Sequence, residues 1–254
     1  QNNKNLKIEP SAYYLRLANK LIQILSGISS TGRLYEVDLR LRPLGESSPL
    51  ATSIKTFDEY YNPAKKEGNA WVWEYMTLTR ARVISNNENF ENTLQDLINQ
   101  KISSHWQKDF LQKEIEYIYK KFREHRNNKK IEGLDVKNSI GGIFDLEFLL
   151  RFLQLQNLSK NPEIKSQSSK QTIKNLEKIG VLTSEEAEIL AKSFEFLTSS
   201  QNVLRITSES KITKYTEEIL CKVTNQANFA EYKKILEFLM AEIKNIFTKH
   251  INFN

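Results

Sequence analysis

The sequence downstream of residue 87 repeats one pattern, in which apolar residues recur every three or four positions between short polar links. This spacing places the apolar side chains on one face of an α-helix. Each such face has to be covered by another element, so a series of them predicts a helical bundle. The pattern predicts helices near 88–102, 105–126, 143–158, 168–179, 184–206, 214–224 and 228–250.

Two local signals support this interpretation. Thr183 and Glu186 have the spacing of a capping box, in which each residue satisfies a backbone N–H of the other, and they predict the start of the 184–206 helix. The last predicted helix carries a continuous apolar stripe, which consists of Phe229, Tyr232, Leu236, Leu239, Ile243 and Ile246.

The segment NSIGGIFDLEF at 138–148 allows two interpretations. Gly141 and Gly142, followed by Asp145 and Glu147, look like a glycine turn with an acid-x-acid pair. The residues that follow are apolar at helical spacing, so we predict a helix opened by the glycines, on which residues two apart do not point together. Glu147 is expected to pair with Arg151, four residues on. A structural role is favoured, and a direct role near a nucleotide or a partner protein stays open.

Within residues 32–43, GRLYEVDLRLRP, apolar and charged side chains alternate strictly from Tyr35 to Arg42. A period of two predicts a strand with one charged face, which carries Glu36, Asp38, Arg40 and Arg42. One interpretation is an edge strand whose charges pair with one another in solvent. The other is a site in which the carboxylate holds a metal ion and the arginines hold phosphate.

The rest of the N-terminal part is also predicted to be helical. Pro10 begins a helix that ends near Gly27, and a second helix lies near 55–62. A third helix at 70–84 is expected to place Trp71, Tyr75 and Leu78 in the core, with Arg80 and Arg82 in its last turns. The intervening AKKEGN, residues 64–69, is expected to be a polar turn.

Composition and charge argue against several classes of function. The net charge is +6, but the 37 lysines and arginines are scattered among 31 acids, so no nucleic-acid surface is expected. No apolar stretch approaches the roughly 20 residues of a membrane span. The three histidines lack zinc-ligand spacing, and Cys221 has no second cysteine for an internal disulfide. A cytoplasmic location is expected.

Three blocks carry a family resemblance: YEVDLRLRP at 35–43, NAWVWEYMTLTRARVIS at 69–85 and DVKNSIGGIFDLEFLLRFLQL at 135–155. Together they resemble the glutamine-synthetase adenylyltransferases, bifunctional enzymes that attach AMP to a tyrosine of glutamine synthetase and remove it. The AWVWE and LTRAR blocks are more similar to the C-terminal, adenylylating half. The resemblance implies a mainly α chain, with the rear part of an α+β nucleotidyltransferase domain at 1–86 and an all-α bundle at 87–254.

The resemblance also implies a site. Asp38 matches the third metal-binding carboxylate of the wider superfamily, so it is expected to be catalytic and to hold Mg²⁺, with ATP as substrate and with Arg40 and Arg42 binding the nucleotide. The family's D-x-D pair on an earlier strand has no match, because residues 1–31 contain no aspartate and the chain contains no D-x-D. The chain begins with Gln1, and we expect a fragment or broken gene product that is nearly inactive alone.

Three functions therefore compete. The first is part of an enzyme that adenylylates glutamine synthetase and so regulates nitrogen metabolism. The second is a catalytically inactive helical module, which docks glutamine synthetase or a nitrogen-signalling regulatory protein. The third is an RNA-directed nucleotidyltransferase, which would not explain the LTRAR and GGIFDLEF blocks.

Overall fold

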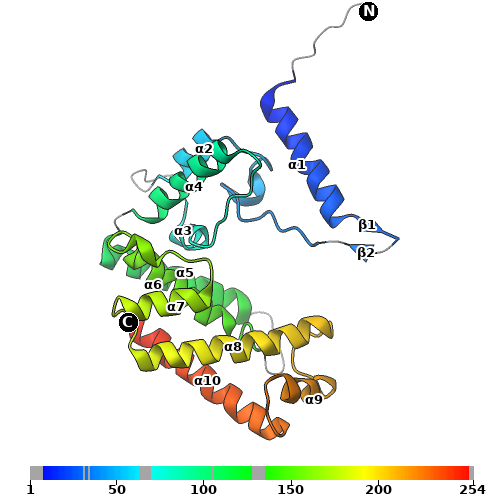
Figure 1. The fold of residues 1–254 in the computed structure, drawn as a ribbon, viewed down its shortest axis with the longest axis vertical. Coiled ribbons are helices and arrows are strands. Elements are labelled where there is room, and N and C mark those ends of the chain that lie inside the picture. The colour runs from blue at the N-terminus through cyan, green and yellow to red at the C-terminus, as the bar shows by residue number, and fades with distance from the viewer. Residues whose placement is uncertain are drawn as a thin grey trace, which may run out of the picture. The chain divides into compact units, whose positions relative to one another are not determined.

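The computed structural model describes residues 8–30, 32–33, 35–62, 70–104, 106–127 and 135–251, and these are mainly α-helical (Figure 1). The predicted fold class, mainly α, is confirmed. The chain divides into two compact units: Gln1–Glu74 with Val83–Leu97, and Tyr75–Arg82 with Ile98–Asn254. The domain boundary expected between residues 86 and 87 stays a prediction.

The first unit contains helices α1 (Pro10–Ser26) and α2 (Ile54–Tyr60), a hairpin of two short strands, and a 3₁₀ turn, η1 (Gly45–Ser47). Helix α1 begins at Pro10 and ends before Gly27, as predicted, and the Gly27 N–H donates to the Gln23 carbonyl. Helix α2 is capped by Ser53, whose side chain accepts from the Thr56 N–H. No residue of α1 is buried, and its apolar stripe of Tyr14, Leu17 and Leu21 is exposed.

The strand predicted over 32–43 is confirmed at Gly32–Arg33 and is wrong for residues 35–43. Strands β1 (Ile28–Ser29) and β2 (Gly32–Arg33) form an antiparallel hairpin, in which Ile28 pairs with Arg33 and Ser29 with Gly32. Residues 35–40 have no strand beside them among the described residues, so nothing completes a hydrogen-bonded ladder there. The alternation of burial persists only in the middle of the segment, where Val37 and Leu39 are half-buried and the neighbouring charged residues are exposed; Tyr35 and Leu41, also expected on the apolar face, are exposed.

The helix predicted at 70–84 is shorter than expected. Helix α3 is Val72–Leu78, so Arg80 and Arg82 lie beyond its end rather than in its last turns. Tyr75 and Leu78 are buried as predicted, but the core interpretation is wrong for Trp71, which is 54% exposed. Trp71 precedes the helix, and its backbone N–H donates to Glu74 Oε2 at 2.7 Å. The polar turn expected at 64–69 lies outside the described residues.

The helices predicted downstream of residue 87 are confirmed close to their expected bounds. The first of them, α4 (Glu88–Ile102), contributes residues to both units. The second unit then contains α5 (Lys108–Asn127), α6 (Ile143–Asn157), the 3₁₀ turn η2 (Pro162–Ile164), α7 (Ser169–Lys178), α8 (Ser184–Ile206), α9 (Lys214–Val223) and α10 (Phe229–His250). The capping box of Thr183 and Glu186 is present at the start of α8.

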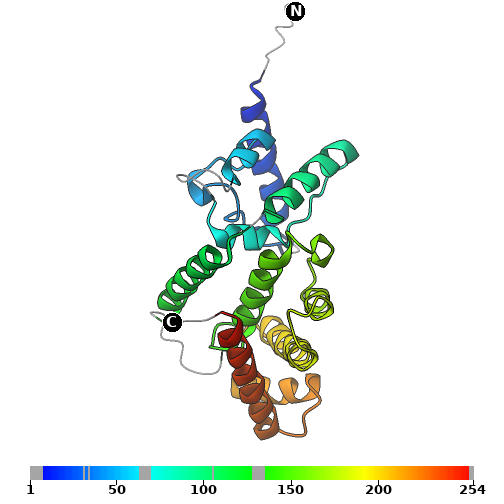
Figure 2. The same ribbon diagram turned by 90° about the vertical axis from the view of Figure 1, so that its left-hand side faces the viewer.

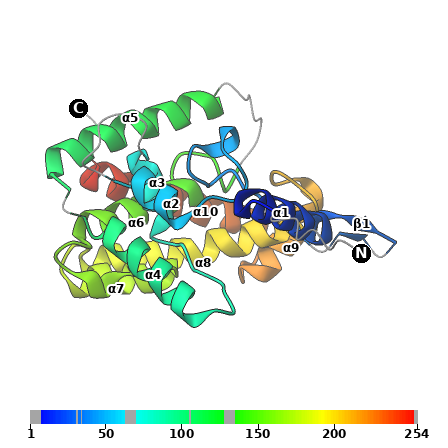
Figure 3. The ribbon, with the colours of Figure 1, turned by 90° about the horizontal axis from the view of Figure 1, so that it is seen from above.

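Helix α6 is the central element of the second unit. It contacts α5, α7, α8 and α10, and it lies between α5 and α8 (Figures 2 and 3). Every residue from Asp145 to Leu155 except Glu147 is buried. A helix that is apolar on nearly all sides requires such a position, because every face has to be covered. Most of the predicted α10 stripe is buried in this core as well: Tyr232, Leu236, Leu239, Ile243 and Ile246.

No helix in the part of the chain that the structure describes combines the length and the apolar character that a membrane span requires.

Candidate functional site

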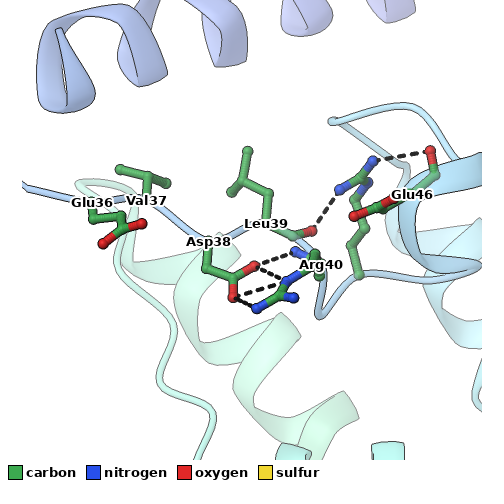
Figure 4. A pocket seen from close by; sticks show the side chains of 7 residues that line it. Glu36, Val37, Asp38, Leu39, Arg40 and Glu46 are labelled. Atoms are coloured by element: carbon green, nitrogen blue, oxygen red, sulfur yellow. Dashed lines mark hydrogen bonds and ion pairs between the residues drawn. The ribbon is translucent and has the colours of Figure 1, made fainter. Parts of the chain in front are cut away.

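The charged segment of the first unit lines an open pocket of about 710 Å³ (Figure 4). Glu36 and Asp38 lie on one side of the backbone, and Val37 and Leu39 lie on the other, as the alternating pattern requires (Figure 4). The lining residues are Glu36, Val37, Asp38, Leu39, Arg40, Arg42 and Glu46. The structure therefore brings all three predicted site residues to one pocket.

Asp38 and Arg40 form a close, solvent-exposed ion pair. Arg40 Nη2 donates to Asp38 Oδ2 at 2.6 Å, and Arg40 Nε lies 3.0 Å from Oδ1 and 3.1 Å from Oδ2. The Arg40 backbone N–H also donates to Oδ1 at 3.0 Å. The hydrogen bonds from the Arg40 side chain and backbone lower the pKa of Asp38 to about 2, and the same carboxylate raises the pKa of Arg40.

Arg42 is held by the backbone of the turn that follows it. Its Nη1 donates to the Leu39 carbonyl at 2.6 Å, and its Nη2 donates to the Ser48 carbonyl at 3.1 Å and the Glu46 carbonyl at 3.4 Å. These bonds close the turn, in which Leu44 and Gly45 both have a left-handed backbone with φ of 62° and 56°. Arg42 lines the pocket while its guanidinium fixes the pocket's wall.

The pocket as arranged does not fit a magnesium ion. Mg²⁺ requires several oxygen ligands in near-octahedral geometry, but both oxygens of Asp38 already accept hydrogen bonds from a cation, Arg40. Within the described residues, no group of three or more histidine, cysteine, aspartate or glutamate side chains could hold a metal ion. A metal would reach the Asp38 carboxylate only after Arg40 had moved.

Sequence reasoning missed one member of the pocket. Glu46 lies three residues beyond the alternating segment, and the turn through Leu44 and Gly45 brings it back to the same pocket. The available signal was Pro43 followed by Gly45, which predicts a change of direction but not which later side chain returns. The catalytic, metal-binding and nucleotide-binding roles of Asp38, Arg40 and Arg42 stay predictions.

The acidic residues of the 138–148 segment lie in the second unit and have structural partners. Asp145 is 1% exposed, forms an ion pair with Arg123, and accepts from the Tyr119 hydroxyl at 3.0 Å and the Gly141 backbone N–H at 2.7 Å. The first turn of α6 is thereby joined to α5. These contacts agree with the predicted helix opened by the glycines, since Gly142 is the N-cap residue of α6.

Glu147 belongs to a separate hydrogen-bonded cluster. Its Oε2 lies 3.3 Å from Arg151 Nη2, which confirms the predicted i, i+4 pair, and 3.2 Å from Arg80 Nη1. The buried Arg151 guanidinium also donates to Ser169 Oγ, Thr172 Oγ1, Gln154 Oε1 and the Ser166 carbonyl. Burial lowers the pKa of Arg151 from its usual value, since desolvation disfavours the charged form. The network favours the structural interpretation of this segment.

Comparison with known proteins gives matches over most of the chain. Residues 1–96 match the family model described as glutamate-ammonia ligase adenylyltransferase, and residues 109–249 match the model described as GlnD PII-uridylyltransferase. The pocket lies within the first match, and α5 to α10 account for nearly all of the second.

Curated relatives agree with the first of these matches. The chain is 27% identical over 249 residues to the bifunctional glutamine synthetase adenylyltransferase/adenylyl-removing enzyme of Rhodopseudomonas palustris, which covers 96% of the chain and 24% of the relative. It is 25% identical over 245 residues to the enzyme of the same description from Bradyrhizobium diazoefficiens, covering 94% of the chain and 24% of the relative. The chain thus spans about a quarter of the length of the curated relatives it matches.

Proposed function

We propose that this chain, which belongs to the family described as GlnD PII-uridylyltransferase through residues 109–249 and matches the glutamate-ammonia ligase adenylyltransferase model over residues 1–96, is part of a nucleotidyltransferase. In this proposal the enzyme transfers AMP from ATP to a tyrosine of glutamine synthetase, the protein named in the description of the curated relatives. The observation that carries the proposal is the pocket of Asp38, Arg40 and Arg42, which lies in the adenylyltransferase-matched segment. This transfer of AMP would regulate nitrogen metabolism. A longer enzyme that contains this chain would also remove AMP from glutamine synthetase.

Each pocket residue has a proposed role. Arg40 is exposed and binds phosphate oxygens of ATP, for which a planar guanidinium is well shaped. Arg42 lines the nucleotide pocket and holds its turn in place through backbone carbonyls. Asp38 is the proposed catalytic carboxylate, and once Arg40 had turned away it would help to hold the Mg²⁺ that accompanies ATP. Magnesium bound with ATP neutralises triphosphate charge.

The partners follow from the same proposal. Glutamine synthetase is the protein substrate, and a nitrogen-signalling regulatory protein is a candidate partner of the helical unit. The proposed location is the cytoplasm, where the buried Cys221 thiol would remain reduced.

A second candidate function is a catalytically inactive module that docks glutamine synthetase or the regulatory protein. It is favoured by the closed state of Asp38, whose carboxylate is fully engaged by Arg40. The two functions differ in whether Asp38 matters for AMP transfer in a longer chain.

Incorporation of labelled AMP into purified glutamine synthetase tests the proposal. Three proteins are compared: this chain, a version extended upstream by an adenylyltransferase segment that carries a D-x-D pair, and the extended version with Asp38→Asn. We expect near-background labelling by this chain, clear labelling by the extended chain, and a loss of about 100-fold or more with Asp38→Asn, since an amide does not supply the same charge.

Glu36→Gln in the extended chain is the matched control, because Glu36 lines the same pocket and is expected to leave labelling largely unchanged. Strong labelling by this chain alone would show that the metal-binding residues are misassigned. Unchanged labelling with Asp38→Asn would remove Asp38 from the mechanism. If the extended chain binds glutamine synthetase without labelling it, the docking module is the better description.

A further inference from the structure

The pocket contains two arginines that are held in different ways. The Arg42 guanidinium donates to three backbone carbonyls, those of Leu39, Glu46 and Ser48, and it is part of the turn's structure. The Arg40 guanidinium has Asp38 as its partner, and their side chains are 72% and 54% exposed. Arg40 can therefore leave its partner without disturbing the fold, whereas Arg42 cannot.

The Asp38–Arg40 pair is close but weak in net terms. Because both side chains are exposed, water and salt compete with both charges, and the pair contributes little net free energy. A phosphate group offers a guanidinium the same bidentate geometry with more negative charge than a single carboxylate. A polyphosphate that enters the pocket thus competes directly with Asp38 for Arg40.

We propose that Arg40 exchanges partners: it covers the Asp38 carboxylate in the free chain and turns to the phosphate oxygens of an arriving nucleoside triphosphate, which uncovers Asp38. The inference rests on the proposed function and adds the order of two steps: Arg40 first binds the phosphate, and the Asp38 carboxylate is then exposed. Asp38 and Arg40 both line the pocket of about 710 Å³, and this volume is in the size range of small-molecule sites. A nucleoside triphosphate can therefore reach both side chains in the same pocket.

Binding of tripolyphosphate in metal-free buffer, measured by calorimetry on the full chain, tests the exchange. Asp38→Asn removes the competing carboxylate, so it is expected to raise the affinity about two- to fivefold, the span of an exposed ion pair. Arg40→Gln is expected to lower the affinity about fivefold or more. In the double variant, Asp38→Asn is expected to give no gain, because the arginine for which it competes is gone.

Removing any nearby acid reduces repulsion of an anion, and Glu36→Gln controls for this. Glu36 lines the same pocket and forms no ion pair with a described residue. The exchange predicts a clearly larger gain with Asp38→Asn than with Glu36→Gln. Equal gains in tripolyphosphate affinity from the two variants would show that each only reduces repulsion of the anion, and this would overturn the exchange. A lack of tripolyphosphate binding at millimolar concentrations would overturn it as well.

The Arg40 side-chain Nε–H signal in a nitrogen–proton NMR spectrum gives a second measurement. It is assigned by its loss in Arg40→Lys, and tripolyphosphate is expected to shift it, with a smaller shift at Arg42. A spectrum in which Arg40 does not respond would overturn the exchange. These readouts need no AMP transfer, so the exchange can hold when the labelling experiment fails and can fail when labelling succeeds.

Discussion

Among the described glycines, Gly141 is the one where an added Cβ would meet the closest neighbouring atom. Its φ is +77°, and a Cβ there would run into the backbone carbonyl of Met240 on α10. We predict that Gly141→Ala lowers the free energy of unfolding by about 3 kcal/mol or more, from strain and backbone displacement together. Chemical denaturation followed by far-UV circular dichroism measures this change.

Gly180 offers the matched control for that prediction. Its φ is +73°, but a Cβ there meets no atom within 4 Å. Gly180→Ala is expected to cost only about 1 kcal/mol, the strain of the left-handed backbone itself. Similar losses for the two variants would mean that the contact with Met240 contributes nothing.

Asp145 supplies a second prediction at the residue scale. It is buried with Arg123, and it also accepts hydrogen bonds from Tyr119 and from the Gly141 N–H. Asp145→Asn leaves the Arg123 charge uncompensated in a site with little water, so the free energy of unfolding is expected to fall by about 3 kcal/mol. Equilibrium urea denaturation of the variant checks this value.

An exposed pair within one helix serves as the comparison for Asp145. Lys192 and Glu188 lie 2.6 Å apart on α8, with both side chains about two-thirds exposed. Lys192→Ala is expected to leave the free energy of unfolding nearly unchanged. If Asp145→Asn lowers the free energy of unfolding as little as Lys192→Ala does, the buried pair does not stabilise the packing of α5 on α6.

Pairings could be predicted from the sequence only where the partners are close along the chain. Glu147 and Arg151 lie four apart on a helix, and Asp38 and Arg40 share one side of an extended segment, so spacing alone places them together. The pairing of Arg80 with Glu147 joins residues 67 positions apart, and no local spacing encodes it. The attachment of Arg42 to carbonyls three to six residues away was not foreseen either, because it depends on the left-handed turn at Leu44 and Gly45 rather than on spacing.

Among the elements, the start of α8 is fixed by interactions that depend on pH. The Glu186 carboxylate accepts from the Thr183 N–H at 2.9 Å and from Lys249 Nζ at 2.6 Å. Burial alone would raise its pKa, but the bonds from Lys249 and Thr183, with the nearby His250, outweigh burial and lower the pKa of Glu186. A carboxyl whose pKa is lower in the folded state stabilises the fold above its unfolded pKa, and this stability disappears as pH falls through the folded value.

We therefore predict that Glu186→Gln lowers the free energy of unfolding by about 1 kcal/mol at pH 7. The difference between the variant and the natural chain should begin to shrink as pH falls below the ordinary glutamate pKa of 4.5, and it should be smallest below the lowered folded pKa, where Glu186 is neutral in the folded state as well. Urea denaturation at a series of pH values measures the difference. A difference that stays constant down to pH 3 would show that the charge of Glu186 is irrelevant.

Helices were predicted more accurately than the strand for a physical reason. A helix satisfies its backbone within one segment, so periodicity and caps such as Thr183 with Glu186 locate α8 at 184–206. A strand needs a neighbour, and the alternating 35–43 segment has none among the described residues. The predicted 70–84 helix instead ends at Leu78, where the N–H groups of Thr79 and Arg80 donate to carbonyls three residues back rather than four, and apolar periodicity does not reveal this tighter turn.

At the scale of the whole molecule, residues 75–82 pack with the second unit although they precede residue 87. Tyr75 is 1% exposed and lies edge-on to Trp106, with ring centroids 4.9 Å apart. Arg80 pairs with Glu147, and Gln167 Nε2 donates to the Ala81 carbonyl at 3.1 Å. These contacts indicate that an independently stable helical part begins before residue 87 and includes residues 75–82.

A fragment of residues 87–254 lacks the side chains of Tyr75 and its neighbours, whereas a fragment of residues 70–254 retains α3 whole. Loss of one or two buried large side chains costs about 2–5 kcal/mol each, so the shorter fragment is expected to melt about 5–15 °C lower. Differential scanning calorimetry of both fragments gives the comparison.

Trp71→Ala in the longer fragment is the control, because Trp71 is exposed and its replacement should leave the melting temperature nearly unchanged. Equal melting temperatures for the two fragments would place the boundary at residue 87, and limited proteolysis of the full chain should then leave residues from 87 onward intact.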